Sequence, residues 1–175
     1  METKTSLTFI LGGARSGKSG YGEALAGEAG GARVYIATAE AFDEEMRARI
    51  ARHQSDRGDG WRTVEAPLDL PGAISREAGA GRVVLVDCLT LWLSNLMAAG
   101  ADIEAQTGQL IAALRAATGP VILVSNEVGL GIVPDNALAR GFRDHAGRLH
   151  QAVAALAGRV VLMAAGLPLE MKPPK

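Results

Sequence analysis

The sequence predicts an α/β fold, in which helices cover both faces of a largely parallel sheet. Three observations predict it: short continuous apolar runs recur along the chain, helical segments alternate with them, and the first run leads into a phosphate-loop motif. We expect a single domain over residues 1–175, because this length supports one substantial core and the chain contains no internal repeat or long linker.

Apolar runs mark the expected strands. Most of them have four or more consecutive apolar residues, which is typical of strands that are buried on both faces. Segment 61–65 alternates enough to suggest a short strand. The expected strands are, in chain order, 8–11, 33–38, 61–65, 82–89, 120–125 and 159–164.

The segments between these strands have helical composition or periodicity. One of them, 43–57, begins with acidic residues, which the dipole at a helix amino terminus favours, and glycine residues end it. The chain is expected to fray over residues 1–5 and to finish in a tail from residue 166. The expected helices are 21–29, 43–57, one within 67–80, 90–99, 103–117 and 138–156.

The first expected strand leads directly into a phosphate loop. We expect its two outer glycines, Gly12 and Gly17, to permit backbone angles that place amides around phosphates with no side chain in the way. The next helix directs its positive end at the same anion. The lysine would contact the β- and γ-phosphates, and the final serine is a magnesium ligand. The alternative is a glycine-rich turn with a solvated lysine, but the flanking strand and helix favour nucleotide binding. The residues that match G-x-x-x-x-G-K-[ST] are Gly12, Gly13, Ala14, Arg15, Ser16, Gly17, Lys18 and Ser19.

Polar residues follow several of the apolar runs. Ligands of parallel sheets bind beyond the carboxyl ends of the strands, so we expect residues 12–19, Thr38, Asp87 and 125–127 to lie along one edge. Asp87 follows four apolar residues, as the acidic residue of a Walker B strand does, and would hold magnesium. Alternatively, it caps the helix expected from Thr90. The phosphate loop in the same chain favours the metal role.

The helix expected over 43–57 carries a histidine near its end. Met46, Ile50, His53 and Arg57 are spaced by four, three and four residues, so they share one helix face. Neutral imidazole can attack phosphorus and form a phosphoramidate, which divides one transfer into two, whereas a simple kinase needs no such group. Alternatively, His53 is a half-buried structural histidine. The arginines near it, of which Arg57 shares its helix face, would bind phosphate oxygens through their guanidinium groups, or else form a solvated basic face.

The polar stretch 125–134 follows another buried strand. Its glycines either allow close approach of a ligand or form an ordinary turn. The charged residues of 138–156 are expected to form mostly a solvated face. The large aromatic residues are expected to pack rather than to stack on nucleobases: Trp61, Trp92 and Phe142.

Charge and cysteine content exclude several classes of protein. The net charge of −1 provides no basic field for nucleic acid or an anionic membrane. The single cysteine, Cys88, excludes an intramolecular disulfide and fits a reducing compartment. No apolar run approaches the ~20 residues that span a bilayer, and the amino terminus does not resemble a signal peptide. We therefore expect a cytoplasmic protein with no nucleic-acid partner and no stable membrane insertion.

Several segments together resemble one enzyme family. Over residues 7–172 the chain is similar to the bifunctional adenosylcobinamide kinase/adenosylcobinamide-phosphate guanylyltransferases of cobalamin biosynthesis. The phosphate loop alone is generic, whereas the histidine segment combined with 126–129 is specific. Gly20, Gly58 and His150 depart from the usual family residues, outside the proposed nucleophile and phosphate loop. The segments that carry the resemblance are 12–19, 49–53, 61–65, 86–90, 125–134, 142–144 and 166–168.

The resemblance implies a RecA-like phosphate-loop domain, a homotrimer and two reactions. In the first, ATP or GTP phosphorylates the aminopropanol hydroxyl of adenosylcobinamide. In the second, His53 takes GMP from GTP, with release of pyrophosphate, and passes it to adenosylcobinamide phosphate to give adenosyl-GDP-cobinamide. Lys18 is the other implied catalytic residue, and Ser19 and Asp87 would hold magnesium. The nucleotide-binding residues implied outside the phosphate loop are Ala37, Thr38, Ala39, Gln54, Ser55, Asp56, Arg57, Glu65 and Asp87.

Two other functions compete with this interpretation. A simple phosphate-loop small-molecule kinase would leave His53 structural and would take no covalent label from GTP. A non-catalytic GTP switch would sense the γ-phosphate through its loops and bind a protein partner, but it has no evident use for a histidine beside the nucleotide.

Overall fold

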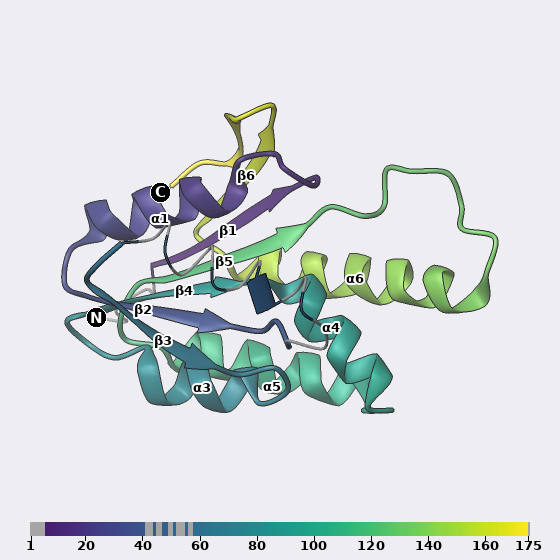
Figure 1. The fold of residues 1–175 in the computed structure, drawn as a ribbon, viewed down its shortest axis with the longest axis horizontal. Coiled ribbons are helices and arrows are strands. Elements are labelled where there is room, and N and C mark those ends of the chain that lie inside the picture. The colour runs from purple at the N-terminus through teal and green to yellow at the C-terminus, as the bar shows by residue number, and fades with distance from the viewer. Residues whose placement is uncertain are drawn as a thin grey trace.

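A seven-stranded sheet forms the centre of the computed structural model (Figure 1). The strand order is β3-β2-β4-β5-β1-β6-β7, and neighbouring strands are parallel except β6 and β7. The structure describes residues 6–40, 44, 47–48, 51, 55 and 58–174. The strands are β1 (Leu7–Gly12), β2 (Ala32–Ala37), β3 (Trp61–Glu65), β4 (Arg82–Asp87), β5 (Val121–Asn126), β6 (Arg159–Ala164) and β7 (Leu167–Lys172).

Helices cover both faces of the sheet, as predicted. Helix α1 lies on one face, over a core that includes Ile10, Leu85 and Val124, and the other helices lie on the opposite face (Figure 1). The core on that side is larger and contains Trp92 and Leu110, both fully buried. The helices are α1 (Lys18–Ala29), α3 (Leu70–Glu77), α4 (Leu89–Ala98), α5 (Ile103–Ala116) and α6 (Ala137–Leu156).

Strand β4 shows why the apolar runs are continuous. Its residues 83–86 are all buried, and they alternate between the two cores. Val84 and Val86 belong to the larger core, whereas Val83 and Leu85 belong to the core under α1. The predicted short strand at 61–65 is confirmed as β3, which lies at the sheet edge and is half-exposed.

Two predicted boundaries are wrong in a way that matters for the site. Helix α1 begins at Lys18 rather than at residue 21, because Gly17 is its N-cap and the Tyr21 N–H donates to the Gly17 carbonyl at 3.0 Å. Strand β4 ends at Asp87, and Leu89, which was expected in the strand, begins α4. The lysine of the phosphate loop is therefore already a helical residue.

The prediction of a tail from residue 166 is also wrong. Strand β7 pairs antiparallel with β6, and the two are joined by a tight turn at Ala165 and Gly166, with φ of 51° and 78°. Left-handed conformations at both turn positions suit a short hairpin. Pro168 is tolerated because β7 is an edge strand. A proline and two charged residues within six positions weaken the strand signal, which explains the error.

The helix expected over 43–57 is described only in part. Its remaining residues, among them His53, lie outside the described residues. The described residues of this segment are helical: Glu44, Arg47, Ala48, Ala51 and Ser55. Within the part of the chain that the structure covers, no helix is both long and apolar enough to cross a membrane.

Candidate active site

The phosphate loop joins β1 to α1 at the carboxyl edge of the sheet (Figure 1). Its last turn requires Gly17, whose φ of 92° lies in the left-handed region. Lys18 is only 9% exposed, and its Nζ donates to the carbonyl oxygen of Gly13 at 3.0 Å. The ammonium group and the amino terminus of α1 are thus brought to one place, an arrangement suited to a phosphate group.

The inner side of the loop is crowded around Gly12. A Cβ atom at this position would lie 2.4 Å from Ser16 Oγ and 2.8 Å from the carbonyl oxygen of Met163. Gly12 does not have a positive φ, so of the two reasons expected for a glycine here, the special backbone angle and the absence of a side chain, only the second applies. Ser16 Oγ is buried with no hydrogen-bond partner among the described residues. Such a hydroxyl fits a phosphate oxygen as its acceptor.

The turn between β6 and β7 supports the phosphate loop, a contact that the sequence analysis missed. The Gly166 N–H donates to the Ser16 carbonyl at 3.0 Å. A Cβ atom at Gly17 would lie 3.3 Å from the Cα of Gly166, so the two turns are in close contact. Of the segment 166–168, Gly166 therefore holds the phosphate loop in place through its backbone.

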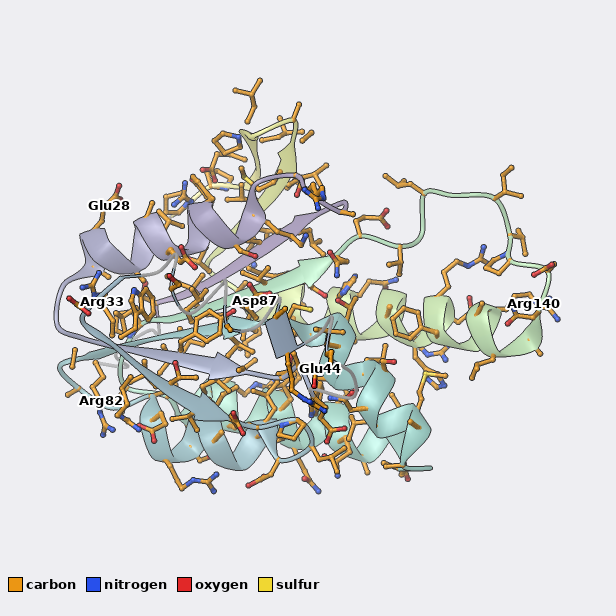
Figure 2. All side chains as sticks on the ribbon, in the orientation of Figure 1. Glu28, Arg33, Glu44, Arg82, Asp87 and Arg140 are labelled. Carbon is orange, nitrogen blue, oxygen red and sulfur yellow. The ribbon has the colours of Figure 1, made fainter. Side chains whose placement is uncertain are left out.

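Asp87 and Asn126 lie at the same edge of the sheet. Gly12 pairs with Asn126, and Ala37 pairs with Asp87, in the register of the parallel strands. Asn126 ends β5, which adjoins β1, and Asp87 ends β4, which is one strand further from the strand that leads into the phosphate loop. Asp87 lies at the carboxyl end of β4, whereas Arg82 lies at the other end of the strand (Figure 2).

Asp87 does not cap α4, which excludes the alternative role considered for it. The N-cap is Cys88, and no side chain makes a capping hydrogen bond there. The Ser19 hydroxyl and the Asp87 carboxylate are hard oxygen ligands, which suit magnesium. No group of three or more His, Cys, Asp or Glu side chains that could hold a metal occurs among the described residues. This donor set fits an ion that keeps water and phosphate ligands.

Thr38 is fully buried, and its hydroxyl is used within the protein. Oγ1 donates to the Cys88 carbonyl at 2.7 Å and accepts from the Cys88 N–H at 2.8 Å. This side chain extends the pairing of β2 with β4 beyond the last residues of both strands. The hydroxyl is therefore not free to bind a nucleotide.

The other predicted nucleotide-binding residues fall into two groups. Ala37 pairs with Glu65 on one side and with Asp87 on the other, so the sheet brings these three together. Ala39 is half-buried, and Ser55 is exposed and helical. The remaining nucleotide-binding candidates lie outside the described residues: Gln54, Asp56 and Arg57. The proposed nucleophile His53 and the two apolar residues expected on its helix face, Met46 and Ile50, lie outside them as well.

The loop after β5 is anchored to the phosphate loop by Glu127. The Glu127 N–H donates to the Gly12 carbonyl at 3.0 Å. The Glu127 carboxylate accepts from the N–H groups of Gly129 at 2.7 Å and Leu130 at 3.2 Å. The side chains of Leu130 and Ile132 are 85% and 98% exposed. A carboxylate therefore organises a turn that carries apolar side chains into solvent.

His150 does not belong to the solvated face expected for α6. Its Nε2 lies 2.8 Å from the Oγ of Ser125, which is fully buried, and its ring contacts Phe9 with a centroid distance of 5.6 Å. Burial lowers the pKa of His150 to about 4, although the Glu127 carboxylate acts in the opposite direction. A neutral imidazole thus joins α6 to β5 close to the site.

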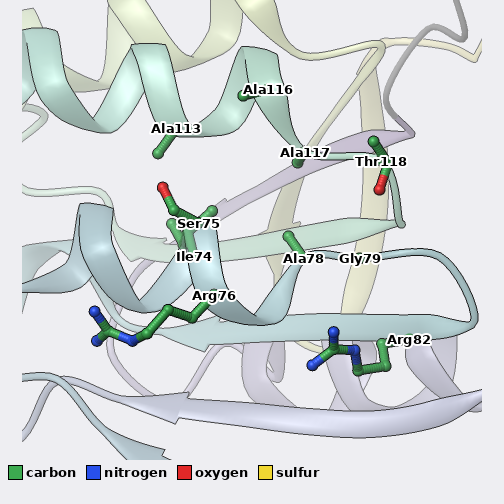
Figure 3. Close-up of a pocket in the computed structure, with 10 residues that line it drawn as sticks. All are labelled: Ile74, Ser75, Arg76, Ala78, Gly79, Arg82, Ala113, Ala116, Ala117 and Thr118. Carbon is green, nitrogen blue, oxygen red and sulfur yellow. The ribbon is translucent and has the colours of Figure 1, made fainter.

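A cavity of about 220 Å³ lies at the opposite edge of the sheet, between α3, α5 and the start of β4 (Figure 3). Its two arginines, Arg76 and Arg82, are paired with Asp69 and Glu77. None of the predicted site residues lines this cavity, so it is separate from the phosphate loop.

Comparison with known proteins shows the family. The family model described as cobinamide kinase / cobinamide phosphate guanyltransferase matches residues 8–171. The chain belongs to this family. The match spans the phosphate loop, the strand ends and most of β7, and it confirms the predicted bifunctional transferase of cobalamin biosynthesis.

Relatives of this cobinamide kinase/guanyltransferase are similar over almost their whole length. The bifunctional adenosylcobalamin biosynthesis protein CobP of Pseudomonas aeruginosa is 51% identical over 166 residues, which are 94% of this chain and 96% of the relative. The bifunctional adenosylcobalamin biosynthesis proteins CobU of Escherichia coli and Salmonella typhimurium are each 40% identical over 181 residues. Each match covers 95% of this chain and 99% of the relative.

Solved structures resemble the family member in fold alone. An ATPase of a bacterial type III secretion system has a TM-score of 0.59 at 14% identity, and the match covers 94% of this chain and 56% of that chain. A KaiC-like protein of Pyrococcus horikoshii has a TM-score of 0.51 at 13% identity, covering 90% and 70%. Both have phosphate-loop folds, so the predicted RecA-like class is confirmed.

Proposed function

We propose that both reactions of this enzyme take place at the carboxyl edge of the sheet, around the phosphate loop. The chain is a bifunctional cobinamide kinase and cobinamide phosphate guanylyltransferase. Two groups of the loop support this assignment of the site. The Lys18 side chain is buried, and the buried Ser16 hydroxyl has no hydrogen-bond partner among the described residues. Both groups belong to a loop whose backbone and helix terminus favour a phosphate anion.

In the kinase reaction, the loop binds the triphosphate of ATP or GTP. The cobinamide hydroxyl oxygen attacks the γ-phosphorus and loses its proton, while the bond to the β–γ bridging oxygen breaks and the nucleoside diphosphate leaves. Lys18 and the amides of the loop neutralise charge on the phosphates, and positioning supplies most of the remaining rate enhancement. Ser19 and Asp87 would hold magnesium, which neutralises further phosphate charge when bound.

In the guanylyltransferase reaction, His53 accepts GMP. A neutral imidazole nitrogen attacks the α-phosphorus of GTP, the bond to the β-phosphate breaks, and pyrophosphate leaves. A phosphate oxygen of cobinamide phosphate then attacks the same phosphorus, the P–N bond breaks, and free histidine is restored. Family membership supports this role, as does the place of His53 in the sequence, on the segment that follows β2.

We also propose GTP-site residues outside the phosphate loop, the molecules with which the enzyme interacts, and an assembly of several copies of the chain. We assign the enzyme small-molecule partners, cobinamide and its phosphate, and no nucleic acid. Apolar side chains that are exposed on the loop after β5 and on β7 support contact between copies of the chain, which we propose form a homotrimer: Leu130, Ile132, Leu167 and Leu169. Thr38 is left out of the proposed GTP site, because it is fully buried and its hydroxyl is bonded to Cys88. The residues proposed to line the GTP site besides the phosphate loop are Ala37, Ala39, Gln54, Ser55, Asp56, Arg57, Glu65 and Asp87.

GTP labelled at the α-phosphate tests the role of His53. After incubation and denaturing electrophoresis, we expect a covalent label that is labile to acid and stable to alkali. His53→Ala should lose the label, because no other group forms the phosphoramidate. His145→Ala, which removes a histidine paired with Arg148 on α6, is the matched control and should be labelled like the wild type. An unlabelled wild-type enzyme would favour a simple kinase, and a fully labelled His53→Ala would place the nucleophile elsewhere.

A further inference from the structure

We infer that Asn95 of α4 is a positioning residue for guanylyl transfer. Its side chain holds the end of β2, where the segment that carries His53 begins. The inference rests on the proposed role of His53, and it adds a residue that acts through the backbone rather than on the nucleotide.

The Asn95 amide joins two chain segments that leave neighbouring strands. Nδ2 donates to the Thr38 carbonyl at 2.8 Å and to the Pro67 carbonyl at 3.0 Å. Thr38 directly follows β2, and Pro67 lies just beyond β3. Both hydrogens of one amide are therefore used, and they cross-link positions 57 and 28 residues away in the sequence.

Thr38 needs this bond because it lies beyond the regular pairing of the sheet. Its N–H donates weakly to the Asp87 carbonyl at 3.4 Å, and its hydroxyl is bound to the backbone of Cys88. Thr38 itself is fully buried, so its carbonyl would lose a protein donor without Asn95. A buried carbonyl is almost always paired, and a lost partner is usually regained by movement of the backbone.

The same network continues toward the phosphate loop. Cys88 Sγ lies 3.1 Å from Thr90 Oγ1, which accepts from Asn126 Nδ2 at 2.9 Å. Asn126 pairs with Gly12 at the start of the phosphate loop. The backbone and side chain of Cys88, together with the Thr90 hydroxyl, thus connect the exit of β2 to Asn126 beside the phosphate loop.

The accuracy of this connection matters for the chemistry. An attacking atom must lie about 3–3.5 Å from the phosphorus before reaction, and a displacement of about 1 Å caused far from the chemistry can cost ~100-fold in rate. Asn95 sets where residues 39 and 40 leave the sheet, and hence the starting point of the His53 segment. Loss of the amide should slow the attack of His53 more than it weakens nucleotide binding.

Two substitutions isolate the donor function. Asn95→Leu has a similar size and no donor, and Asn95→Asp keeps the shape but cannot donate when ionised. For both, we expect the rate of His53 labelling at saturating GTP to fall about 10- to 100-fold, with KM for GTP changed less than about threefold. The control is Thr107→Val on α5, which removes a partly buried hydroxyl bonded to the Ile103 carbonyl within its own helix. This control should label at the wild-type rate.

The outcomes separate this inference from the function on which it rests. Labelling of both Asn95 variants at the wild-type rate, in an enzyme whose His53→Ala variant is unlabelled, would overturn the positioning role alone. A raised KM with an unchanged maximal rate would do the same, because it would mean that Asn95 serves binding. A wild-type enzyme without label would overturn both. Asn95→Asp provides a second test if Asn95→Leu does not fold, and thermal unfolding identifies such a failure.

Discussion

Replacing Gly12 by alanine places a methyl group where the structure has no room for it. The new Cβ would lie 2.4 Å from Ser16 Oγ, 2.8 Å from the Met163 carbonyl oxygen and 3.1 Å from the Met163 Cβ. The serine hydroxyl can rotate away. The Met163 carbonyl cannot, because β6 pairs with β1 at this position, where Met163 is the partner of Gly12. Either the strand pairing or the phosphate loop must therefore move.

The expected cost follows from that geometry. An extra methyl in a packed site typically costs about 1–3 kcal/mol, and the loss of chain entropy in the unfolded state returns about 0.4–1 kcal/mol. A net cost of about 1–2 kcal/mol should lower Tm by about 3–8 °C for a chain of this length. Displacement of the loop also weakens at least one charge-assisted hydrogen bond to phosphate, so Kd for a triphosphate should rise about tenfold or more.

Gly13→Ala is the matched control in the same loop. A Cβ atom at Gly13 would meet nothing within 4 Å, and its φ is not positive. We expect its Tm to stay within about 2 °C of the wild type. Calorimetry measures the two Tm values, and titration with a fluorescent triphosphate analogue measures Kd. If Gly12→Ala were as stable as Gly13→Ala and bound nucleotide equally well, the steric account of Gly12 would be refuted.

Two further predictions concern His150 and Gly166. The pKa of His150 is about 4 in the folded protein against 6.5 for a free histidine, so the unfolded chain binds the proton more tightly and stability falls as pH decreases from 6.5 toward 4. Urea unfolding should show that the wild type loses about 2 kcal/mol more than His150→Asn between pH 7 and pH 5, and equal losses would contradict the shift. Gly166→Val should cost about 1–2 kcal/mol and weaken nucleotide binding, because φ is 78° and the residue touches the phosphate loop. Gly166→Asn should lower the stability less, since asparagine tolerates this conformation. If both variants bound nucleotide with the same affinity as the wild type, the turn would not support the phosphate loop.

The parts of the site that could be predicted lie within short segments. The phosphate loop is a local pattern, and the carboxylate of Asp87 is identified by the apolar run before it. Even there, local reasoning had limits. Gly12 was expected to supply a special backbone angle, which it does not have, and to keep a side chain out of the loop. What a side chain there would meet could not be predicted, because Met163 lies on another strand.

The residues that were missed act through partners far along the chain. Asn95 reaches Thr38 across 57 residues, and His150 reaches Ser125 across 25. Gly166 contacts the phosphate loop from the other end of the sequence. No periodicity or spacing signals such pairs, because they depend on which strands become neighbours. The place of β6 beside β1 brings Gly166 to the phosphate loop, and the pairing of β2 with β4, which leads into α4, brings Thr38 near Asn95.

By itself, the sequence determined the fold class, the phosphate loop and the family, since each is recorded in apolar periodicity or in short runs of specific residues. Only the tertiary structure decided that β7 completes the sheet, that the Thr38 hydroxyl is hydrogen-bonded to Cys88, and that Asn95 holds the exit of β2. The physical reason is the separation along the sequence of the residues that interact. Secondary structure follows from interactions between residues a few positions apart, whereas the alignment of a nucleotide site follows from side chains that meet only after the helices have packed on the sheet.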